Sequence, residues 1–421
     1  MSQWYKIDNT GKIFHAVSSS SNSAVYRVSA TLYEMINPEV LQEALDIVAI
    51  RFPTLMVRVR KGLFWDFLEA NDDSLLVKEE TDYPCAPIDR KENNAFLIRV
   101  LYFNKRISVE VFHSVTDGGG AQEFLKTLVY QYLNLMGKNI MTDGTILLPE
   151  DEVDQEESED SFVRYVNHSE PAKSQDKDQK AYQLSGTELS PRGINLVQGI
   201  MDAGALNTFA KSQGTSLTGL LTSVLILTIY EERKKNSDAY ISVAIPVNLR
   251  KVFPSKTMRN FFSVSNIGVQ VKKDMTMDEI IEAVTRELIK KTEKSFLQRV
   301  INHFVSFQKN LLLRIVPVFI KYPIMRFAFN SVGENRKTLT LTNLGNVKVP
   351  DEMRPFIDWM DIVLYPTKKS PINCGAATIN NKLTMTFARS IDENEFIKAF
   401  FKNLTRMTGL EVTVHSNGWG E

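Results

Sequence analysis

Residues 106–120 read RISVEVFHSVTDGGG, and this stretch decides how the chain is interpreted. An apolar run, FLIRVLYF, precedes it at residues 96–103, and Asn104-Lys105 between the two runs suits a two-residue hairpin turn. The pattern predicts two paired strands that end at His113. Three glycines then interrupt the strand pattern, and apolar residues return at helical spacing until Gly137 ends the helix. His113 is therefore expected in a loop between a strand and a helix.

The length and composition of the chain predict two compact lobes. A single hydrophobic core usually stops growing at about 250–300 residues, and this chain has 421. Apolar residues make up 43% and charged residues 24%, as in ordinary globular proteins. The 50 Lys and Arg residues balance 50 Asp and Glu residues, so there is no overall field to gather nucleic acid or an anionic membrane. We expect no nucleic-acid partner.

Helices and strands are predicted to alternate in both halves of the chain. Asn37-Pro38 resembles an N-cap followed by proline at the first helical position, so a helix is expected over residues 38–51. Thr276 and Glu279 have capping-box spacing before another helix. Strands are expected in the second half at residues 240–247, 262–271, 338–342, 382–388 and 410–414. This alternation predicts an α/β or α+β fold with two related lobes.

A polar segment separates the two halves. Residues 150–160, EDEVDQEESED, contain eight carboxylates in eleven positions, and the residues after them are polar and lysine-rich. Because such a segment has little apolar surface to bury, we expect a solvated crossover. The expected division is an N-terminal lobe at 1–140, the crossover at 141–190 and a C-terminal lobe at 191–421.

We expect the protein to be cytoplasmic, which is the default when the sequence shows no targeting signal. Its first residues, MSQWYKID, lack the apolar region of a signal peptide. The longest apolar run, LTGLLTSVLILTIY at residues 217–230, has 14 residues and is expected to be a buried helix, because about 20 are needed to span a bilayer. Cys85 and Cys374 lack C-x-x-C spacing, and we expect both to be reduced and unreactive.

The hexapeptide HSVTDG at residues 113–118 carries the candidate chemistry. The chain has only five histidines, and imidazole titrates near neutrality, so His113 can take a proton from a hydroxyl or amine and return it to a leaving group. Asp117 either orients His113 directly, as in a catalytic triad, or braces the loop through an ion pair. Gly118 and the next two glycines are expected to permit positive φ and close backbone approach. A strand end followed by a plain turn explains the same residues without chemistry.

The pattern H-x-x-x-D-G after a hydrophobic strand resembles the signature of the acyltransferase superfamily that includes chloramphenicol acetyltransferase, plant BAHD acyltransferases and condensation domains. PVNLR at residues 246–250, followed by RNFF at 259–262, resembles a second-half segment of those proteins. The resemblance implies that Arg250 pairs with Asp117, which we expect to be a bidentate contact joining the lobes, and that Asn260 has an orienting role.

A third resemblance lies near the end of the chain. LTNLG at residues 341–345 is similar to the S-N-x-G segment of the alcohol acetyltransferase-like branch. Thr342 and Asn343 are therefore candidate donors to the oxyanion of a tetrahedral intermediate, although a polar turn between strands explains them equally well. Phe112 stands where condensation domains commonly have a second histidine, and the plant D-F-G-W-G signature is absent. The bacterial alcohol acetyltransferase-like branch therefore fits best.

The resemblance implies two chloramphenicol acetyltransferase-like lobes, of the α+β two-layer sandwich type, with a tunnel between them. It also implies an acyltransferase that uses neither a metal nor a tightly bound cofactor. Acetyl-CoA or a longer acyl-CoA would be the co-substrate, and a small-molecule alcohol or amine would be the acceptor. We expect the protein to be a monomer. One alternative is a carrier-protein-bound donor, which the acidic run disfavours because such carriers are usually acidic. The other is a catalytically silent binding or scaffold protein, which the intact motif disfavours.

Residues 309–330, KNLLLRIVPVFIKYPIMRFAFN, mix long apolar side chains with four basic ones. One interpretation is a basic amphipathic surface that makes a peripheral membrane contact or guides a long-chain acceptor. The other is a buried helix whose basic side chains reach solvent. Pro317 and Pro323 argue against one continuous interfacial helix.

Overall fold

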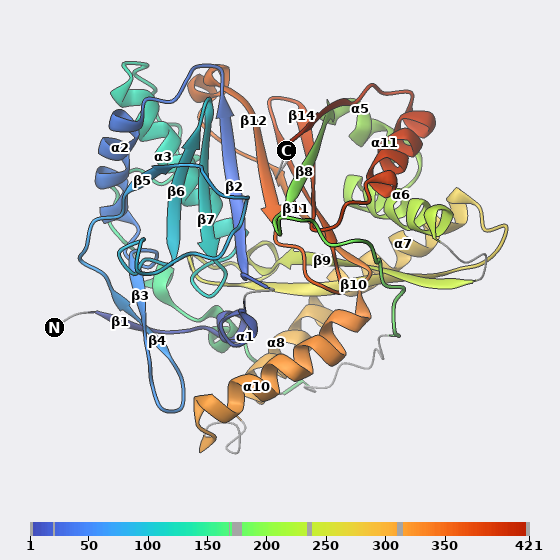
Figure 1. The fold of residues 1–421 in the computed structure, drawn as a ribbon, viewed down its shortest axis with the longest axis horizontal. Helices are drawn as coiled ribbons and strands as arrows, with labels where there is room; N and C mark the ends of the chain where they lie inside the picture. Colours follow the sequence, from blue (N-terminus) through green and yellow to red (C-terminus); the bar gives the residue numbers. More distant parts are fainter. Residues whose placement is uncertain are drawn as a thin grey trace.

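A computed structural model describes residues 3–19, 22–167, 169–170, 179–233, 238–309 and 315–417. Its first sheet has the strand order β12 (Ile357–Leu364), β2 (Val25–Leu32), β7 (Arg106–Phe112), β6 (Ile98–Phe103) and β5 (Val77–Glu79). β6 and β7 form the expected hairpin, with Asn104 at a φ of 51° in the turn. Helices α2 (Pro38–Arg51) and α3 (Gly118–Leu135) pack together on this sheet (Figure 1).

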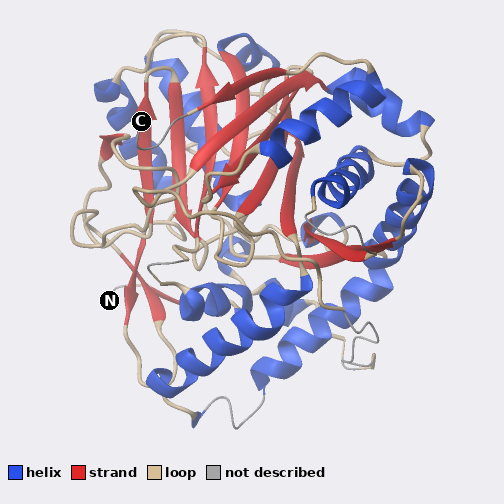
Figure 2. Cartoon of the chain, turned by 45° about the vertical axis from the view of Figure 1, so that its right-hand side comes forward, coloured by secondary structure: helices blue, strands red, loops and turns tan. Residues whose placement is uncertain are grey.

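The second sheet forms the core of the other lobe. Its strand order is β10 (Phe262–Val271), β9 (Ala239–Asn248), β11 (Leu339–Asn346), β13 (Ile372–Ile379), β14 (Lys382–Arg389), β8 (Asn195–Asp202) and β15 (Thr413–Ser416). The helices of this lobe are α5 (Ala203–Ser212), α6 (Leu217–Glu232), α7 (Met277–Thr292) and α11 (Glu395–Thr408). The long apolar run forms α6, which is buried between the sheet and the neighbouring helices as expected. Figure 2 shows the strands in the centre of the molecule with helices around them.

A smaller layer joins the two lobes from below in the view of Figure 1. It contains the sheet β1 (Trp4–Lys6), β4 (Phe67–Ala70) and β3 (Val57–Arg60), and the helices α1 (Asn9–Val17), α8 (Lys294–Lys309) and α10 (Val318–Ala328). Helix α4 (Ser161–Arg164) packs on α8, and α1 packs on α10. The remaining short helices are η1 (Gln155–Ser158), η2 (Leu249–Lys251), η3 (Phe329–Gly333), η4 (Glu334–Arg336) and η5 (Asp351–Phe356).

Local sequence signals place the helix starts where they were expected. The side chain of Asn37 accepts hydrogen bonds from the backbone N–H groups of Glu39 and Val40, at 3.0 and 3.3 Å, so α2 begins at Pro38. Thr276 and Glu279 form the expected capping box of α7. The last predicted strand begins later than expected, because β15 starts at Thr413.

Strand β12 crosses between the expected lobes. It comes from the second half of the chain but pairs with β2 of the first lobe, from Ile357 opposite Leu32 to Leu364 opposite Tyr26. It also packs tightly against β13, where a Cβ atom on Gly375 would lie 2.3 Å from the carbonyl oxygen of Ile362. The expected division, with residues 191–421 as a separate C-terminal lobe, does not include a strand that pairs with the first lobe. The sheets of the two lobes are therefore joined directly through β12.

The expectation of a solvated crossover is wrong for part of the acidic run. Glu157 is 4% exposed, and its two carboxylate oxygens accept hydrogen bonds from Arg51 at 2.7 and 2.8 Å. Phe162, just after the run, is fully buried beside Phe261. A run of carboxylates in the sequence does not reveal that an arginine 106 residues earlier lies beside one of them.

Two features concern membranes and thiols. No single helix in the described ranges is long and apolar enough to cross a bilayer, and one pair, α5 with α6, meets that test together with a bend of 80°. Cys85 and Cys374 are free and buried.

Of the residues 309–330, α10 is exposed along one side, with Phe319 69% exposed, so the interpretation as a buried helix is wrong. Residues 310–314 lie outside the described ranges.

Candidate active site

His113 follows the last residue of β7 and is half-buried at the junction of the two lobes. Its backbone N–H donates to the carbonyl oxygen of Ala24 at 2.8 Å, which extends the pairing with β2 by one residue. The imidazole ring stacks on Phe14 of α1, with ring centroids 3.9 Å apart and planes 4° apart. Tyr26 and Phe262 add ring contacts at 4.6 and 5.3 Å. Aromatic packing from three separate elements fixes the ring plane.

A hydrogen-bonded chain orients the imidazole within that plane. Nδ1 of His113 lies 3.1 Å from Oδ1 of Asn260, and Nδ2 of Asn260 donates to Oδ2 of Asp8 at 3.0 Å. Asp8 is 1% exposed, and its Oδ1 accepts from the backbone N–H of Gly11 at 2.7 Å as the N-cap of α1. The guanidinium of Arg259 approaches Oδ2 of Asp8 to 3.7 Å.

This chain determines which imidazole nitrogen carries the proton. A carboxylate only accepts hydrogen bonds, so Asn260 must turn its NH₂ group toward Asp8. Its carbonyl oxygen then faces His113, and Nδ1 must be the protonated nitrogen that donates to it. Nε2 is left with a free lone pair, which is the form that a general base requires.

Burial lowers the pKa of His113 from its ordinary value of 6.5, because removing the ring from water disfavours the charged imidazolium. The carboxylate of Asp117, the hydrogen bond to Asn260 and the carboxylate of Asp8 oppose this shift by stabilising the positive charge. The result is an imidazole that is neutral at physiological pH and that has negative charge nearby to stabilise a transient imidazolium.

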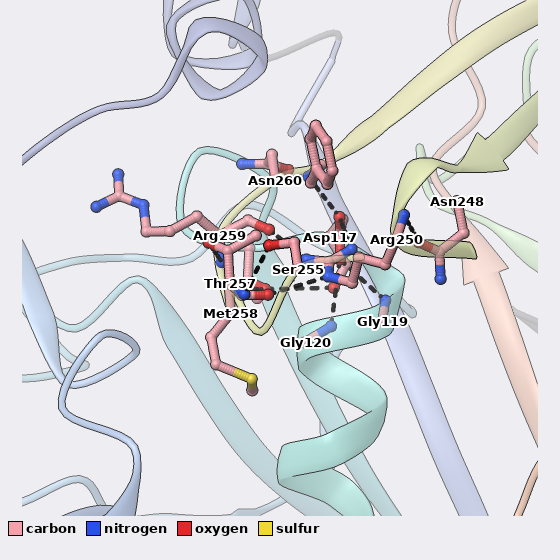
Figure 3. Close-up of polar contacts among 12 residues, drawn as sticks. Asp117, Gly119, Gly120, Asn248, Arg250, Ser255, Thr257, Met258, Arg259 and Asn260 are labelled. Carbon is pink, nitrogen blue, oxygen red and sulfur yellow. Dashed lines mark hydrogen bonds and ion pairs between the residues drawn. The ribbon is translucent and has the colours of Figure 1, made fainter. Parts of the chain in front are cut away.

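Asp117 braces the loop and does not form the triad-like pair. Its Oδ1 accepts from the backbone N–H groups of Gly119 and Gly120 at 3.1 and 3.2 Å, so it is the N-cap of α3. Its Oδ2 accepts from Arg250 at 2.8 Å (Figure 3). The same oxygen accepts from the backbone N–H of Phe261 at 2.7 Å. Four donors share the carboxylate of this buried residue. Asp117 therefore ties the motif loop to the second half of the chain and affects His113 through its charge.

Arg250 joins the lobes as the resemblance implied, but the expected bidentate geometry is wrong. Only Nη1 contacts Asp117, because Oδ1 of the carboxylate is already held by α3. The other guanidinium nitrogens donate to the backbone carbonyl oxygens of Thr257 and Arg259. Arg250 thus shapes the loop that carries Asn260, as Figure 3 shows.

The glycines of the motif serve close approach and not positive φ. None of Gly118, Gly119 and Gly120 has a positive φ, because all three are in the first turn of α3. A Cβ atom at Gly120 would lie 2.1 Å from Oγ1 of Thr116 and 2.7 Å from the carbonyl oxygen of Met258. Gly118 faces Leu344, which its Cβ would approach to 3.3 Å. The backbone of α3 can therefore pack directly on the segment that contains Met258.

A cavity with about 680 Å³ of empty space, part of it open to solvent, lies between the lobes. Residues from both halves of the chain line it, including His113, Arg250, Thr342 and Asn343. Asn343 has its amide occupied, since Nδ2 donates to Thr218 at 3.1 Å and Oδ1 accepts from Gly345 at 2.8 Å. The hydroxyl of Thr342 makes no side-chain hydrogen bond to any residue in the described ranges, so it is the freer of the two candidate donors.

A second hollow adjoins this cavity. It shares Pro246, Asn248, Lys251 and Asn343 with the cavity and extends to the N-terminus of α6 and along α7. Lys251 is exposed at the junction between the two spaces. The two spaces therefore lie side by side and have these four residues as common walls.

Sequence reasoning missed two residues that shape this site. Asp8 is not among the predicted site residues, although an aspartate three residues before Gly11 at the start of a helix is an N-cap signal. Phe14 had no signal, because nothing local indicates that it stacks on a histidine 99 positions later in the printed sequence. The candidates His113, Asp117, Arg250 and Asn260 come together at one place, whereas Gly118, Thr342 and Asn343 line the cavity beside it.

Comparisons with known proteins concern the fold and one segment of the chain. Residues 201–356 match the family model described as alcohol acetyltransferase. A search of curated protein sequences gives no significant match. Among solved structures, the chain is similar to polyketide synthase associated protein 5 from Mycobacterium tuberculosis, with a TM-score of 0.62, 12% identity, and coverage of 96% of this chain and 97% of that one.

Two fungal proteins are also similar in structure. Trichothecene 15-O-acetyltransferase TRI3 from Fusarium sporotrichioides gives a TM-score of 0.60 at 10% identity, covering 96% of this chain and 94% of that one. TRI101 from F. graminearum, complexed with coenzyme A and deoxynivalenol, gives a TM-score of 0.61 at 10% identity, covering 97% of this chain and 99% of that one. At these identities the comparisons establish a shared two-lobed fold.

Proposed function

We propose that this protein, which has the two-lobed fold of the chloramphenicol acetyltransferase-like acyltransferases and an alcohol acetyltransferase-like segment at residues 201–356, transfers an acyl group from a thioester to a hydroxyl or amine. His113 is the general base. The observation that carries the proposal is the occupation of Nδ1 by Asn260 in a ring that lines the cavity between the lobes, because it leaves Nε2 available.

In the proposed reaction, His113 takes one proton from the acceptor and gives it to the departing thiolate. Nε2 takes the proton from the acceptor as the acceptor oxygen or nitrogen attacks the thioester carbonyl carbon. The carbonyl oxygen becomes an oxyanion, for which the hydroxyl of Thr342 is the candidate donor. Collapse of the tetrahedral intermediate breaks the carbon–sulfur bond, and the imidazolium returns the proton to the departing thiolate. The negative charge of Asp117 and Asp8 stabilises the imidazolium during this interval.

We propose acetyl-CoA or a longer acyl-CoA as the donor, entering through the hollow beside Lys251. Its phosphates suit an exposed ammonium group and the N-terminus of α6, where the helix dipole is positive. The structure of TRI101 with coenzyme A supports this choice by analogy. A carrier-protein donor is the alternative, and the acidic run at residues 150–160 disfavours it because like charges repel.

A thiol-release assay tests the proposal. The full chain is incubated with acetyl-CoA or an acylated carrier protein and a panel of alcohols and amines. We expect acceptor-dependent release of free thiol from acetyl-CoA, and His113→Ala should lower turnover at least about a hundredfold. His415→Ala is a matched control, because that histidine is exposed on β15 and stacks on Trp359 away from the cavity. Wild-type turnover in His113→Ala, with the control also unchanged, would exclude His113 as the base.

A further inference from the structure

Helix α10 has large apolar side chains on its outer side and buries the charged side chain of Lys321 on its inner side. Phe319 is 69% exposed, Ile324 59% and Phe327 74%. They fall on one side, since Phe319, Pro323 and Phe327 repeat every four residues and Ile320 and Ile324 do so beside them. Lys321 on the opposite side is buried. A helix on a protein in water usually has the reverse arrangement.

Specific polar contacts hold α10 in this orientation. Nζ of Lys321 donates to the carbonyl oxygen of Phe64 at 2.8 Å and lies 3.5 Å from the ring centroid of Trp65. The hydroxyl of Tyr322 donates to Asp66 at 3.2 Å. Arg326 donates to the carbonyl oxygens of Ala16 and Ser18 at 3.2 and 3.0 Å. The outward apolar face therefore does not result from a loosely attached helix.

The tip of the β3–β4 hairpin extends the same face. The backbone N–H of Val318 donates to the carbonyl oxygen of Leu63 at 2.9 Å, so the tip lies against the start of α10. Leu63 is 63% exposed and Phe64 44% exposed. The α10 surface is thus formed by two elements and consists of Leu63, Phe64, Phe319, Ile320, Ile324 and Phe327.

The exposed charged side chains on α10 and on the β3–β4 hairpin are basic. The sequence from Lys294 to Gly333 contains no Asp or Glu, although the whole chain has as many acidic as basic residues. Arg326 is exposed on α10, and Arg60 and Lys61 are exposed on the β3–β4 hairpin beside Leu63. Large apolar side chains among basic groups are the composition of a surface that enters the headgroup region of an anionic membrane. A symmetric dimer through this face would instead bring like charges together.

We infer that the α10 surface docks the protein on an anionic lipid bilayer. The apolar side chains enter the headgroup region, and the surrounding cations contact acidic lipid headgroups. The surface adjoins the site, because α10 packs on α1 and Phe14 of α1 stacks on His113. A bound bilayer would therefore lie on the side of the molecule where α1 backs His113. The inference stands independently of the proposed function.

Co-sedimentation with vesicles tests the inference on the full chain. Vesicles of phosphatidylcholine containing phosphatidylglycerol are compared with pure phosphatidylcholine at low and high salt. We expect binding to the anionic vesicles that weakens as salt rises. The double variant Phe319→Gln with Phe327→Gln should bind at least about tenfold more weakly, since two large apolar groups no longer leave water.

A second double variant, Ile50→Gln with Met141→Gln, is the matched control, because both residues are apolar and at least 70% exposed outside the α10 surface. It should bind like the wild type. Each variant is checked for an unchanged melting temperature and for thiol release with soluble substrates, which separates failure of docking from failure of the proposed function. Equal binding to neutral and anionic vesicles, or unchanged binding of the Phe319/Phe327 variant, overturns the inference. The inference is also overturned if no lipid binding is seen and the protein forms a dimer in lipid-free solution that the same variant dissociates.

Discussion

Replacing Asp8 with asparagine should lower turnover about tenfold to about a hundredfold while leaving the fold intact. The helix cap survives, because the side-chain oxygen of the introduced asparagine can still accept from the N–H of Gly11, and asparagine is as good an N-cap as aspartate. The other side-chain atom becomes an NH₂ donor where Oδ2 now accepts from Asn260. Two donors then face each other, and Asn260 must rotate its amide. After rotation it presents NH₂ to Nδ1 of His113, which favours the tautomer with the proton on Nε2.

The size of the effect follows from the bond that is lost. A hydrogen bond to a charged group contributes roughly 1.5–3 kcal/mol, and about 1.4 kcal/mol corresponds to a factor of ten in an equilibrium. The population of the productive tautomer should therefore fall by about tenfold to about a hundredfold, and kcat should fall with it. The Asp8 carboxylate also raises the pKa of His113, so its loss should move the acid limb of the rate profile to lower pH.

The assay is acetyl-CoA thiol release across a pH series, combined with nitrogen NMR of the histidine side chains to identify the protonated ring nitrogen. Asp202→Asn is a matched control: Asp202 caps α5 through the N–H of Ala205 at 2.7 Å and accepts from Nδ2 of Asn381 at 2.9 Å, but lies in the other lobe. The control should retain full turnover. Unchanged kcat in Asp8→Asn, or an Nδ1–H tautomer that persists in it, would refute the reasoning.

Three further predictions concern other parts of the site. Asp117→Ala should lower stability by about 3–5 kcal/mol along with the rate, because a largely buried Arg250 loses its partner; a normal melting temperature would contradict the bracing role. In the wild type, kcat should rise with pH through an apparent pKa below 6.5 and then stay constant, because the neutral form of His113 is the active one and burial lowers its pKa. A midpoint above 6.5 would contradict this assignment. Lys251→Glu should raise KM for acetyl-CoA about fivefold with little change in kcat, as expected for one exposed charge; an unchanged KM would place the donor elsewhere.

The local elements of the fold could be predicted from the sequence because each is encoded within a few neighbouring residues. The hairpin around Asn104, the helix start at Asn37 and the capping box at Thr276 all depend on contacts over at most a few positions. The strand order could not be predicted in the same way. β12 joins the sheet of the other lobe through a pairing of Ile357 with Leu32, and no local pattern specifies a partner so far away.

The same distinction holds for the candidate site, where the sequence predicted the residues but not their roles. The sequence by itself located His113 at a strand end before a helix and indicated Asp117, Arg250 and Asn260 as its associates. Only the tertiary structure decided their roles, because each role depends on a partner more than a hundred positions away: Asp117 accepts from Arg250, and Asn260 turns between His113 and Asp8. The neighbours of the Asn260 amide in space set the direction of its hydrogen bonds. That direction decides which nitrogen of the His113 imidazole is basic, and spacing along the chain does not reveal it.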